Sequence, residues 1–134
     1  AWTEGENLKN ITPPLYIDAT EAGWAKSLPP FDFILLVNLL HLISWNETKT
    51  LISELSKALK ANGIALVYGP FMRNGLLTSE GDTIFHNSLV QTDPDIGYKN
   101  DSEILTLFSN LSLLHLESVE MPANNVAFIL QKNG

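Results

Sequence analysis

The stretch ILLVNLLHLISW, Ile34–Trp45, is almost wholly apolar, yet it contains an amide at Asn38 and an imidazole at His41. Its first five residues and the three residues before them form a continuous apolar run, Phe31–Asn38. A run without polar alternation predicts a strand covered on both faces, as in a parallel sheet. The two polar residues therefore mark the place where burial is expected to end and a site to begin.

Four further segments have the character of strands. They are PLYID at Pro14–Asp18, IALVYG at Ile64–Gly69, LLHLESVEM at 113–121 and VAFILQK at 126–132. The tetrapeptide PANN joins the last two segments and predicts an antiparallel hairpin. The second strand of this hairpin alternates poorly and is expected to be central in the sheet.

Three helices are predicted between these strands. Ser44 and Glu47 form a capping box before the first helix, which is expected to close at Asn62–Gly63. Two more helices are predicted over about 80–91, with Ser79 as the cap, and over about 101–110. Strands that alternate with helices predict an α/β domain with a mostly parallel sheet.

Composition narrows the classes of function. The chain has 134 residues, a formal net charge of −7 and no cysteine. No cluster of Lys and Arg is present, so binding to a nucleic-acid backbone is not expected. The lack of cysteine excludes disulfides and thiolate zinc sites and fits a reducing compartment, and a cytoplasmic location is expected because no signal peptide is visible.

Neither a membrane span nor a metal site is expected. The apolar stretches are too short and too interrupted to cross a bilayer. The three histidines, His41, His86 and His115, lack the spacing of metal ligands.

Four motifs follow one another along the chain: LLVNLLHLISW, LVYGPFMRNG, DPDIGYKN and MPANN. In their order and spacing they resemble the signatures of the methyltransferase-like protein 26 family of class I methyltransferase-like proteins. The resemblance runs from the first residues to the last. It implies a Rossmann-like sheet with the strand order 3-2-1-4-5-7-6 that binds S-adenosylmethionine.

The resemblance covers only the C-terminal portion of that domain. The fold places a glycine-rich loop after its first strand and a ribose-binding acid after its second, and this sequence contains no G-x-G. The chain is therefore expected to be a single domain over 1–134, a partial class I sheet that lacks the first two strands and closes with an antiparallel hairpin. We expect the fragment itself to be inactive and its full-length parent to be the methyltransferase.

Ligands of open α/β sheets bind at the carboxyl ends of the strands. The resemblance implies that Asp18 and Ala19 lie at the adenine end of the cofactor and that Asn38 and Leu39 lie near its methionine end. Two structural alternatives stay open from the residues alone. Asp18 would cap the short helix toward Trp24, and Asn38 would satisfy free backbone groups at the strand end.

His41 is the candidate general base, because an imidazole has the pKa range needed to deprotonate an acceptor. The alternative is a partly buried histidine bonded to the backbone. Tyr68, Gly69 and Phe71 at the next strand end, with Asn124 in PANN, are candidates for the acceptor pocket. The structural alternatives are loop geometry with a core aromatic for the first three residues and a tight hairpin for Asn124.

Three functional hypotheses stay open. The first is an S-adenosylmethionine-dependent methyltransferase, seen as a fragment, whose methyl acceptor is a small molecule or another unknown group. The second is a non-catalytic binding or scaffolding module of the same fold. The third is a different α/β enzyme, such as a nucleotide-binding oxidoreductase, which the closing hairpin disfavours.

The missing strands also predict a partner. Without them the strand Phe31–Asn38 would be a long apolar edge, and such an edge pairs readily with another chain. We therefore expect self-association through this strand. The alternative is that Pro14–Asp18 pairs directly beside it. Arg73, the only arginine, is expected to be a solvated loop charge, with binding of an anionic acceptor as the alternative.

Overall fold

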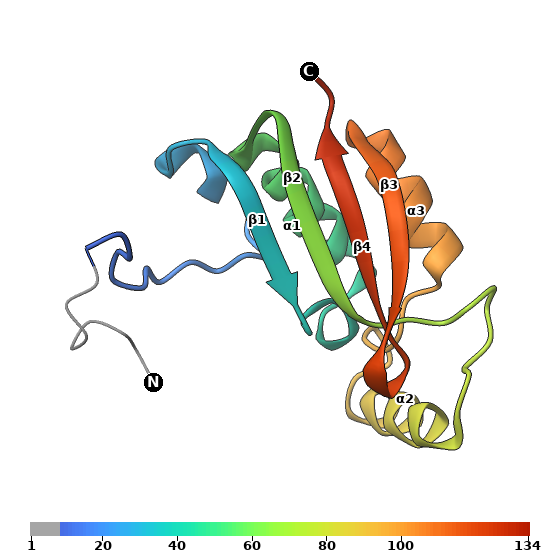
Figure 1. Cartoon of the computed structure of the whole chain (residues 1–134). Helices are drawn as coiled ribbons and strands as arrows, with labels where there is room; N and C mark the ends of the chain where they lie inside the picture. The colour runs from blue at the N-terminus through green and yellow to red at the C-terminus, as the bar shows by residue number, and fades with distance from the viewer. Residues whose placement is uncertain (1–8) are drawn as a thin grey trace.

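A four-stranded sheet with two helices on one of its faces forms most of the chain (Figure 1). The structure is a computed structural model that describes residues 9–134. Its strands are β1 (Phe31–Val37), β2 (Leu59–Pro70), β3 (Leu113–Met121) and β4 (Asn125–Lys132). Its α-helices are α1 (Trp45–Ala58), α2 (Glu80–Thr92) and α3 (Asp101–Asn110), and its 3-10 helices are η2 (Trp24–Ser27), η3 (Leu40–Leu42) and η4 (Pro122–Asn124).

The strand order is β1-β2-β4-β3. β1 and β2 are parallel, whereas β4 is antiparallel to both of its neighbours, β2 and β3. This order reproduces the 4-5-7-6 half of the expected sheet. It confirms the closing hairpin and the central place of its second strand.

The prediction of a strand over Pro14–Asp18 is wrong. The structure gives this segment no strand pairing, and most of its side chains face solvent. β1 is the outermost strand, and its free edge carries no partner among residues 9–134. Pro13 and Pro14 lack backbone N–H groups, which removes two donors that a ladder at this edge would need.

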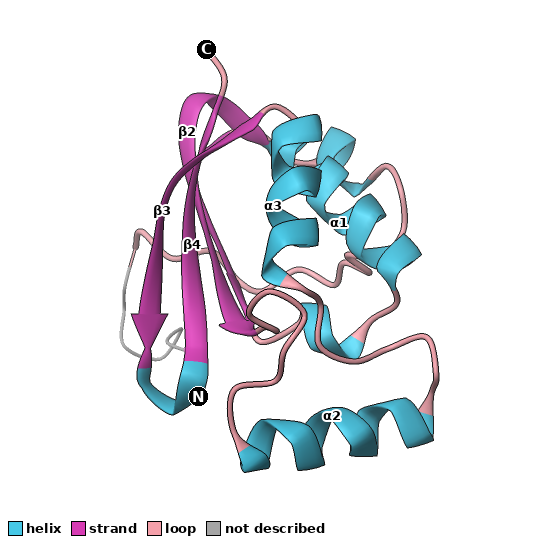
Figure 2. Cartoon of the chain, turned by 90° about the vertical axis from the view of Figure 1, so that its right-hand side faces the viewer, coloured by secondary structure: helices cyan, strands magenta, loops and turns pink. Residues whose placement is uncertain are grey.

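The hydrophobic core lies between the sheet and the helices α1 and α3. Figure 2 shows both helices on the same face of the sheet. Leu51 and Leu55 from α1 and Ile104 from α3 are almost fully buried there. The ring of Phe128 on β4 packs edge-on against Phe71, with 4.9 Å between ring centroids.

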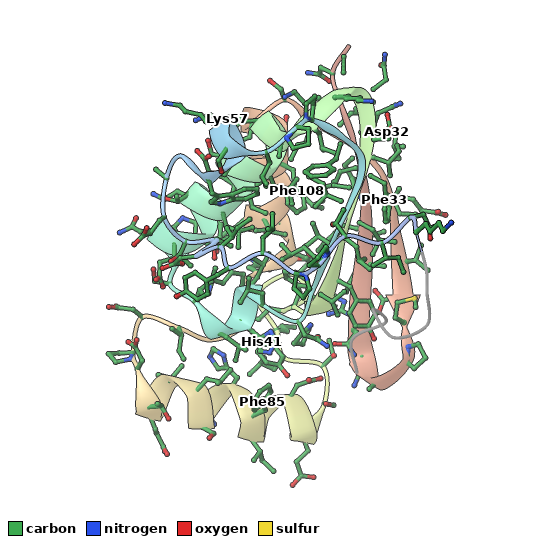
Figure 3. The ribbon with its side chains drawn as sticks, turned by 90° about the vertical axis from the view of Figure 1, so that its left-hand side faces the viewer. Asp32, Phe33, His41, Lys57, Phe85 and Phe108 are labelled. Atoms are coloured by element: carbon green, nitrogen blue, oxygen red, sulfur yellow. The ribbon has the colours of Figure 1, made fainter. Side chains whose placement is uncertain are left out.

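The opposite face of the sheet is open, which corrects the expectation that the first apolar run is covered on both sides. Phe33, Leu35 and Val37 on β1 are 53%, 56% and 47% exposed, whereas Ile34 and Leu36 between them pack on the core. Figure 3 shows Phe33 on β1 and Phe108 among the helices of the core. Within residues 9–134 a broad apolar sheet face is therefore uncovered, and such faces mark contact surfaces.

Both ends of α1 can be compared with the sequence. The capping box is present, because Ser44 Oγ accepts from Glu47 N at 3.1 Å and Glu47 Oε1 accepts from Ser44 N at 2.9 Å. The predicted end at Asn62–Gly63 is wrong, since the helix stops at Ala58 and β2 begins at once. Asn62 instead adopts the left-handed conformation inside β2, with φ of 66°.

The helix α2 lies apart from the core, beyond the carboxyl ends of β1 and β2 (Figures 1 and 2). Ser79 caps it as predicted, accepting from Asp82 N at 3.0 Å. None of its residues is buried. Across residues 9–134, no helix combines the length and the apolar character needed to span a membrane.

Candidate functional site

A cavity of about 440 Å³ lies where β1 and β2 end and α2 approaches. It is lined by Asn38, His41, Leu42, Pro70, Asp82, Phe85, Tyr98, Ala123 and Asn125. These residues come from two strand ends, from η3, from α2, from the loop before α3 and from the hairpin turn. The cavity thus occupies the position at which open α/β sheets bind ligands.

Asn38 ends β1 in a left-handed turn, with φ of 56°. Its backbone N–H donates to the carbonyl of Tyr68 at 2.8 Å, which extends the parallel ladder by one residue. Asparagine tolerates this conformation better than other residues with a Cβ. The position Gly69 lies beside it, since a Cβ there would be 3.7 Å from Asn38 Oδ1. Asn38 and the backbone of Tyr68 and Gly69 therefore form one corner of the site.

His41 lies on η3 and is 6% exposed. Figure 3 shows its ring facing Phe85 of α2, and the two ring centroids are 5.6 Å apart. The rings of His86 and His115 are hydrogen-bonded to Tyr98 N and Ser118 Oγ, whereas neither ring nitrogen of His41 has such a partner within residues 9–134. Burial and the nearby charge of Lys99 lower the pKa of His41, so the imidazole is neutral at pH 7.

The loop before α3 joins the two sides of the site. Gly97 N donates to the carbonyl of His41 at 3.0 Å, and Tyr98 N donates to Nδ1 of His86 at 3.0 Å. Gly97 has φ of 128°, and a Cβ on it would lie 2.9 Å from the His86 ring. Glycine is therefore required where this loop passes between η3 and α2.

Asp82 is the acidic residue of the cavity. It accepts from the hydroxyl of Tyr98 at 2.6 Å and from that of Ser79 at 2.7 Å. Burial raises the pKa of Asp82, but hydrogen bonds from Tyr98, Ser79 and Asn124, with the charge of Arg73, together bring it below the ordinary value. Burial, together with the hydrogen bond to Asp82 and the charge on it, raises the pKa of Tyr98. At pH 7 the pair is a carboxylate and a neutral phenol.

Lys99 is buried beside the cavity rather than in its lining. Its ammonium donates to the carbonyl of Ile43 and, at 3.1 Å, to that of Gly97. Burial lowers the pKa of Lys99 to about 8, against a smaller opposing effect of the charge on Glu47. Lys99 thus fixes the loop to the start of α1 and keeps the charge of His41 suppressed.

Arg73 is an ion-paired residue, which corrects the expectation of a solvated loop charge. Its guanidinium binds both carboxylate oxygens of Glu120, with Nη2–Oε1 and Nε–Oε2 distances of 2.8 and 3.2 Å. It also donates to the carbonyl of Asn124 at 3.0 Å. This contact ties the loop after β2 to the hairpin turn at the rim of the site.

The structure separates the remaining predicted residues from this cavity. Asp18 lines another cavity with Tyr16 and Trp24, and its carboxylate accepts from the N–H and hydroxyl of Thr20 in a local turn. Ala19 accepts from the Trp24 indole at 3.0 Å. Two others lie in or against the core: Phe71 is buried and Leu39 packs on it. The predicted residues that meet at or beside the cavity are Asn38, His41 and the turn residue Asn124, with the backbone of Tyr68 and Gly69 next to Asn38.

Sequence reasoning missed Asp82, Phe85 and Tyr98. Asp82 and Phe85 stand three residues apart on α2 and so share a face of the helix. Tyr98 belongs to the motif DPDIGYKN, which carried the resemblance without a role for any one of its residues. The predicted α2 could have given the first signal, because an acid and an aromatic on one face of a polar helix indicate a contact.

The residues present fit only part of the cofactor implied by the resemblance. Asn38 stands at the strand end where the methionine part would lie. No G-x-G loop occurs in the sequence, and Asp18 lines a different cavity. Residues 9–134 thus do not form a complete S-adenosylmethionine site. Within the same residues, no three or more His, Asp or Glu side chains are grouped as a metal site would require.

Solved structures similar to this fold include methyltransferases. Human N-acetylserotonin methyltransferase in complex with SAM matches 90% of this chain with a TM-score of 0.73 and 18% identity. An O-methyltransferase family protein from Burkholderia thailandensis matches 90% with a TM-score of 0.75 and 14% identity. An O-methyltransferase family 2 protein from Planctomyces limnophilus in complex with apigenin matches 78% with a TM-score of 0.70 and 18% identity.

This chain spans only about a third of those proteins, namely 33%, 35% and 32% of their respective lengths. The likeness and the sheet order define the fold as a partial class I methyltransferase fold. At the level of family, residues 1–132 match the family described as "Protein of unknown function (DUF938)". The chain belongs to this family.

Proposed function

We propose that this chain is the C-terminal portion of an S-adenosylmethionine-dependent methyltransferase. The observation that carries the proposal is the cavity at the carboxyl ends of β1 and β2, which is lined by Asn38 and the buried His41. The ring of His41 has no hydrogen-bond partner within residues 9–134. The fold of the chain, shared with solved methyltransferases, supports it. Residues outside this chain would complete the cofactor site in a longer protein.

In this proposal the residues of the chain position the acceptor and handle its proton. Asn38 offers an amide that both donates and accepts, at the end of β1. His41 is neutral because its pKa is lowered, and its free ring nitrogen accepts a proton from the acceptor group. A lowered pKa makes His41 a weaker base. Close positioning of the acceptor against the methyl donor would therefore supply much of the rate enhancement. The bound cofactor would supply the methyl group.

We also propose that the parent is related to the methyltransferase-like protein 26 family. The four motifs quoted above support this finer assignment. A second proposal concerns this chain alone: two copies associate through the edge strand β1, over Phe31–Asn38. The open apolar face beside that edge supports it.

Calorimetric titration of S-adenosylmethionine and S-adenosylhomocysteine into this chain and into its full-length parent tests the function. We expect binding to the parent. Asn38→Gly removes the amide without straining the left-handed turn, and it should weaken binding to the parent at least tenfold. Asn62→Gly is the matched control, because Asn62 has nearly the same φ, 66°, at the other end of the sheet.

Each outcome of this titration has a distinct meaning. Binding by the parent that Asn38→Gly weakens and Asn62→Gly leaves unchanged supports the proposal. Binding by neither protein would refute it and favour the alternative of a non-catalytic binding module of the same fold. Equal binding by the two variants would remove Asn38 from the cofactor site.

A further inference from the structure

The cavity at the ends of β1 and β2 has one ionised side chain in its lining at pH 7, the carboxylate of Asp82. The pKa of Asp82 is lowered, and that of His41 is lowered as well. The acid is therefore charged and the imidazole is neutral. The charge carried by the lining itself is therefore negative, and the chain as a whole has a formal net charge of −7.

Three aromatic rings line the same cavity as this carboxylate. The centroids of His41 and Phe85 are 5.6 Å apart, those of His41 and Tyr98 are 6.1 Å apart, and those of Phe85 and Tyr98 are 6.1 Å apart. The ring planes cross at 65°, 73° and 78°. The π-faces of aromatic rings attract cations.

The two cationic side chains near the cavity, Arg73 and Lys99, already have partners within the protein. Arg73 is paired with Glu120, and the Lys99 ammonium donates to the carbonyls of Ile43 and Gly97. Neither Arg73 nor Lys99 lines the cavity. An anionic ligand would meet the Asp82 carboxylate without a cation in the lining to bind it. Asp82 is already stabilised by hydrogen bonds from Tyr98 and Ser79, so a cationic ligand would add an ion pair to these contacts, and a neutral ligand would not.

We propose that this cavity binds a protonated amine, with the ammonium on Asp82 and against the rings of Phe85 and Tyr98. The assignment of this amine as the methyl acceptor rests on the proposed function. An ammonium must lose a proton before its nitrogen can act as a nucleophile. His41, whose ring is unpartnered within the described chain, lines the same cavity and can accept that proton.

Three probes that share a phenylethyl group test the proposal: 2-phenylethylamine as the cation, 2-phenylethanol as its neutral isostere and 3-phenylpropionate as the anion. Each is titrated into this chain, and the amide shifts of residues that line the cavity are followed by NMR. We expect the amine to bind about tenfold more tightly than the alcohol, as an ion pair and cation–π contact at a partly exposed site would give. The anion should bind least.

Asp82→Asn should remove the preference for the amine over the alcohol while keeping the hydrogen bond from Tyr98. Glu80→Gln is the matched control, because it removes an equal charge from the same turn of α2 outside the cavity lining. Phe85→Leu, at a side chain that is 42% exposed, should weaken the amine about threefold without affecting the fold.

Equal binding of amine and alcohol, an unchanged preference in Asp82→Asn, or no binding by any probe would each overturn the amine assignment. These results differ from failure of the proposed function. The probes are titrated without cofactor, so cofactor binding to the parent alongside no amine binding would refute the amine alone. Amine binding alongside no cofactor binding by the parent would refute the methyltransferase and leave an amine-binding module.

Discussion

Tyr98→Phe tests whether one hydroxyl holds α2 over the site. The helix α2 has no buried residue, so few contacts resist its opening. The strongest polar one is the 2.6 Å hydrogen bond from Tyr98 to the Asp82 carboxylate. Removing that hydroxyl should therefore loosen α2 while leaving the sheet and its core in place.

The size of the effect follows from the kind of bond. A hydrogen bond to a charged group contributes about 1.5–3 kcal/mol. Asp82 is partly exposed and keeps its bond to Ser79, so we expect the lower end, about 1.5 kcal/mol. Because about 1.4 kcal/mol corresponds to a factor of ten, the opening equilibrium of α2 should rise about tenfold.

Native-state hydrogen exchange measures this directly. The amides of α2 should exchange about tenfold faster in Tyr98→Phe, while those of α1 and α3 keep their rates, because α2 opens as a local unit. Tyr16→Phe is the matched control, since Tyr16 is 98% exposed. Equal acceleration in all three helices, or none in α2, would show that the hydroxyl does not tether α2.

Three further predictions concern pH, capping and association. Lys99 has its pKa lowered from 10.5 to about 8, so the unfolded chain binds more protons between these values and stability rises with pH there. Urea unfolding should show about 2 kcal/mol more stability at pH 10 than at pH 7.5, and an equal rise in Lys99→Met would contradict this origin. Ser44→Ala breaks the capping box of α1 and should lower the free energy of unfolding by about 1 kcal/mol in the same assay, with a change near zero as the contrary result. Leu35→Lys places a charge on the open face of β1 and should shift this chain toward monomer in light scattering. The control Thr106→Lys, on α3, should not change the association. A wild-type chain that is already monomeric would rule out association through β1.

Local sequence rules were enough where short-range contacts decide the structure. The capping box at Ser44 and Glu47 places the start of α1, because both partners lie within one turn. The PANN turn fixes the closing hairpin for the same reason. The end of α1 was misplaced because β2 starts three residues before the Asn62–Gly63 signal and includes Asn62 in a left-handed conformation.

Features that depend on contacts between distant segments could not be predicted from the sequence. The apolar run of β1 reads as buried on both faces, but burial depends on what packs against a strand, and within residues 9–134 nothing covers one of its faces. Pro14–Asp18 has the composition of a strand, yet pairing requires a partner at the right place.

The candidate site shows the same division. The sequence by itself determined that a polar corner follows β1, since Asn38 and His41 interrupt an apolar run at a strand end. Only the tertiary structure decided which residues complete that corner. Asp82 and Tyr98 are sixteen residues apart and meet through one 2.6 Å hydrogen bond. They meet because α2 and the following loop fold back over the strand ends, a path set by contacts between segments distant in sequence rather than by local residue preference.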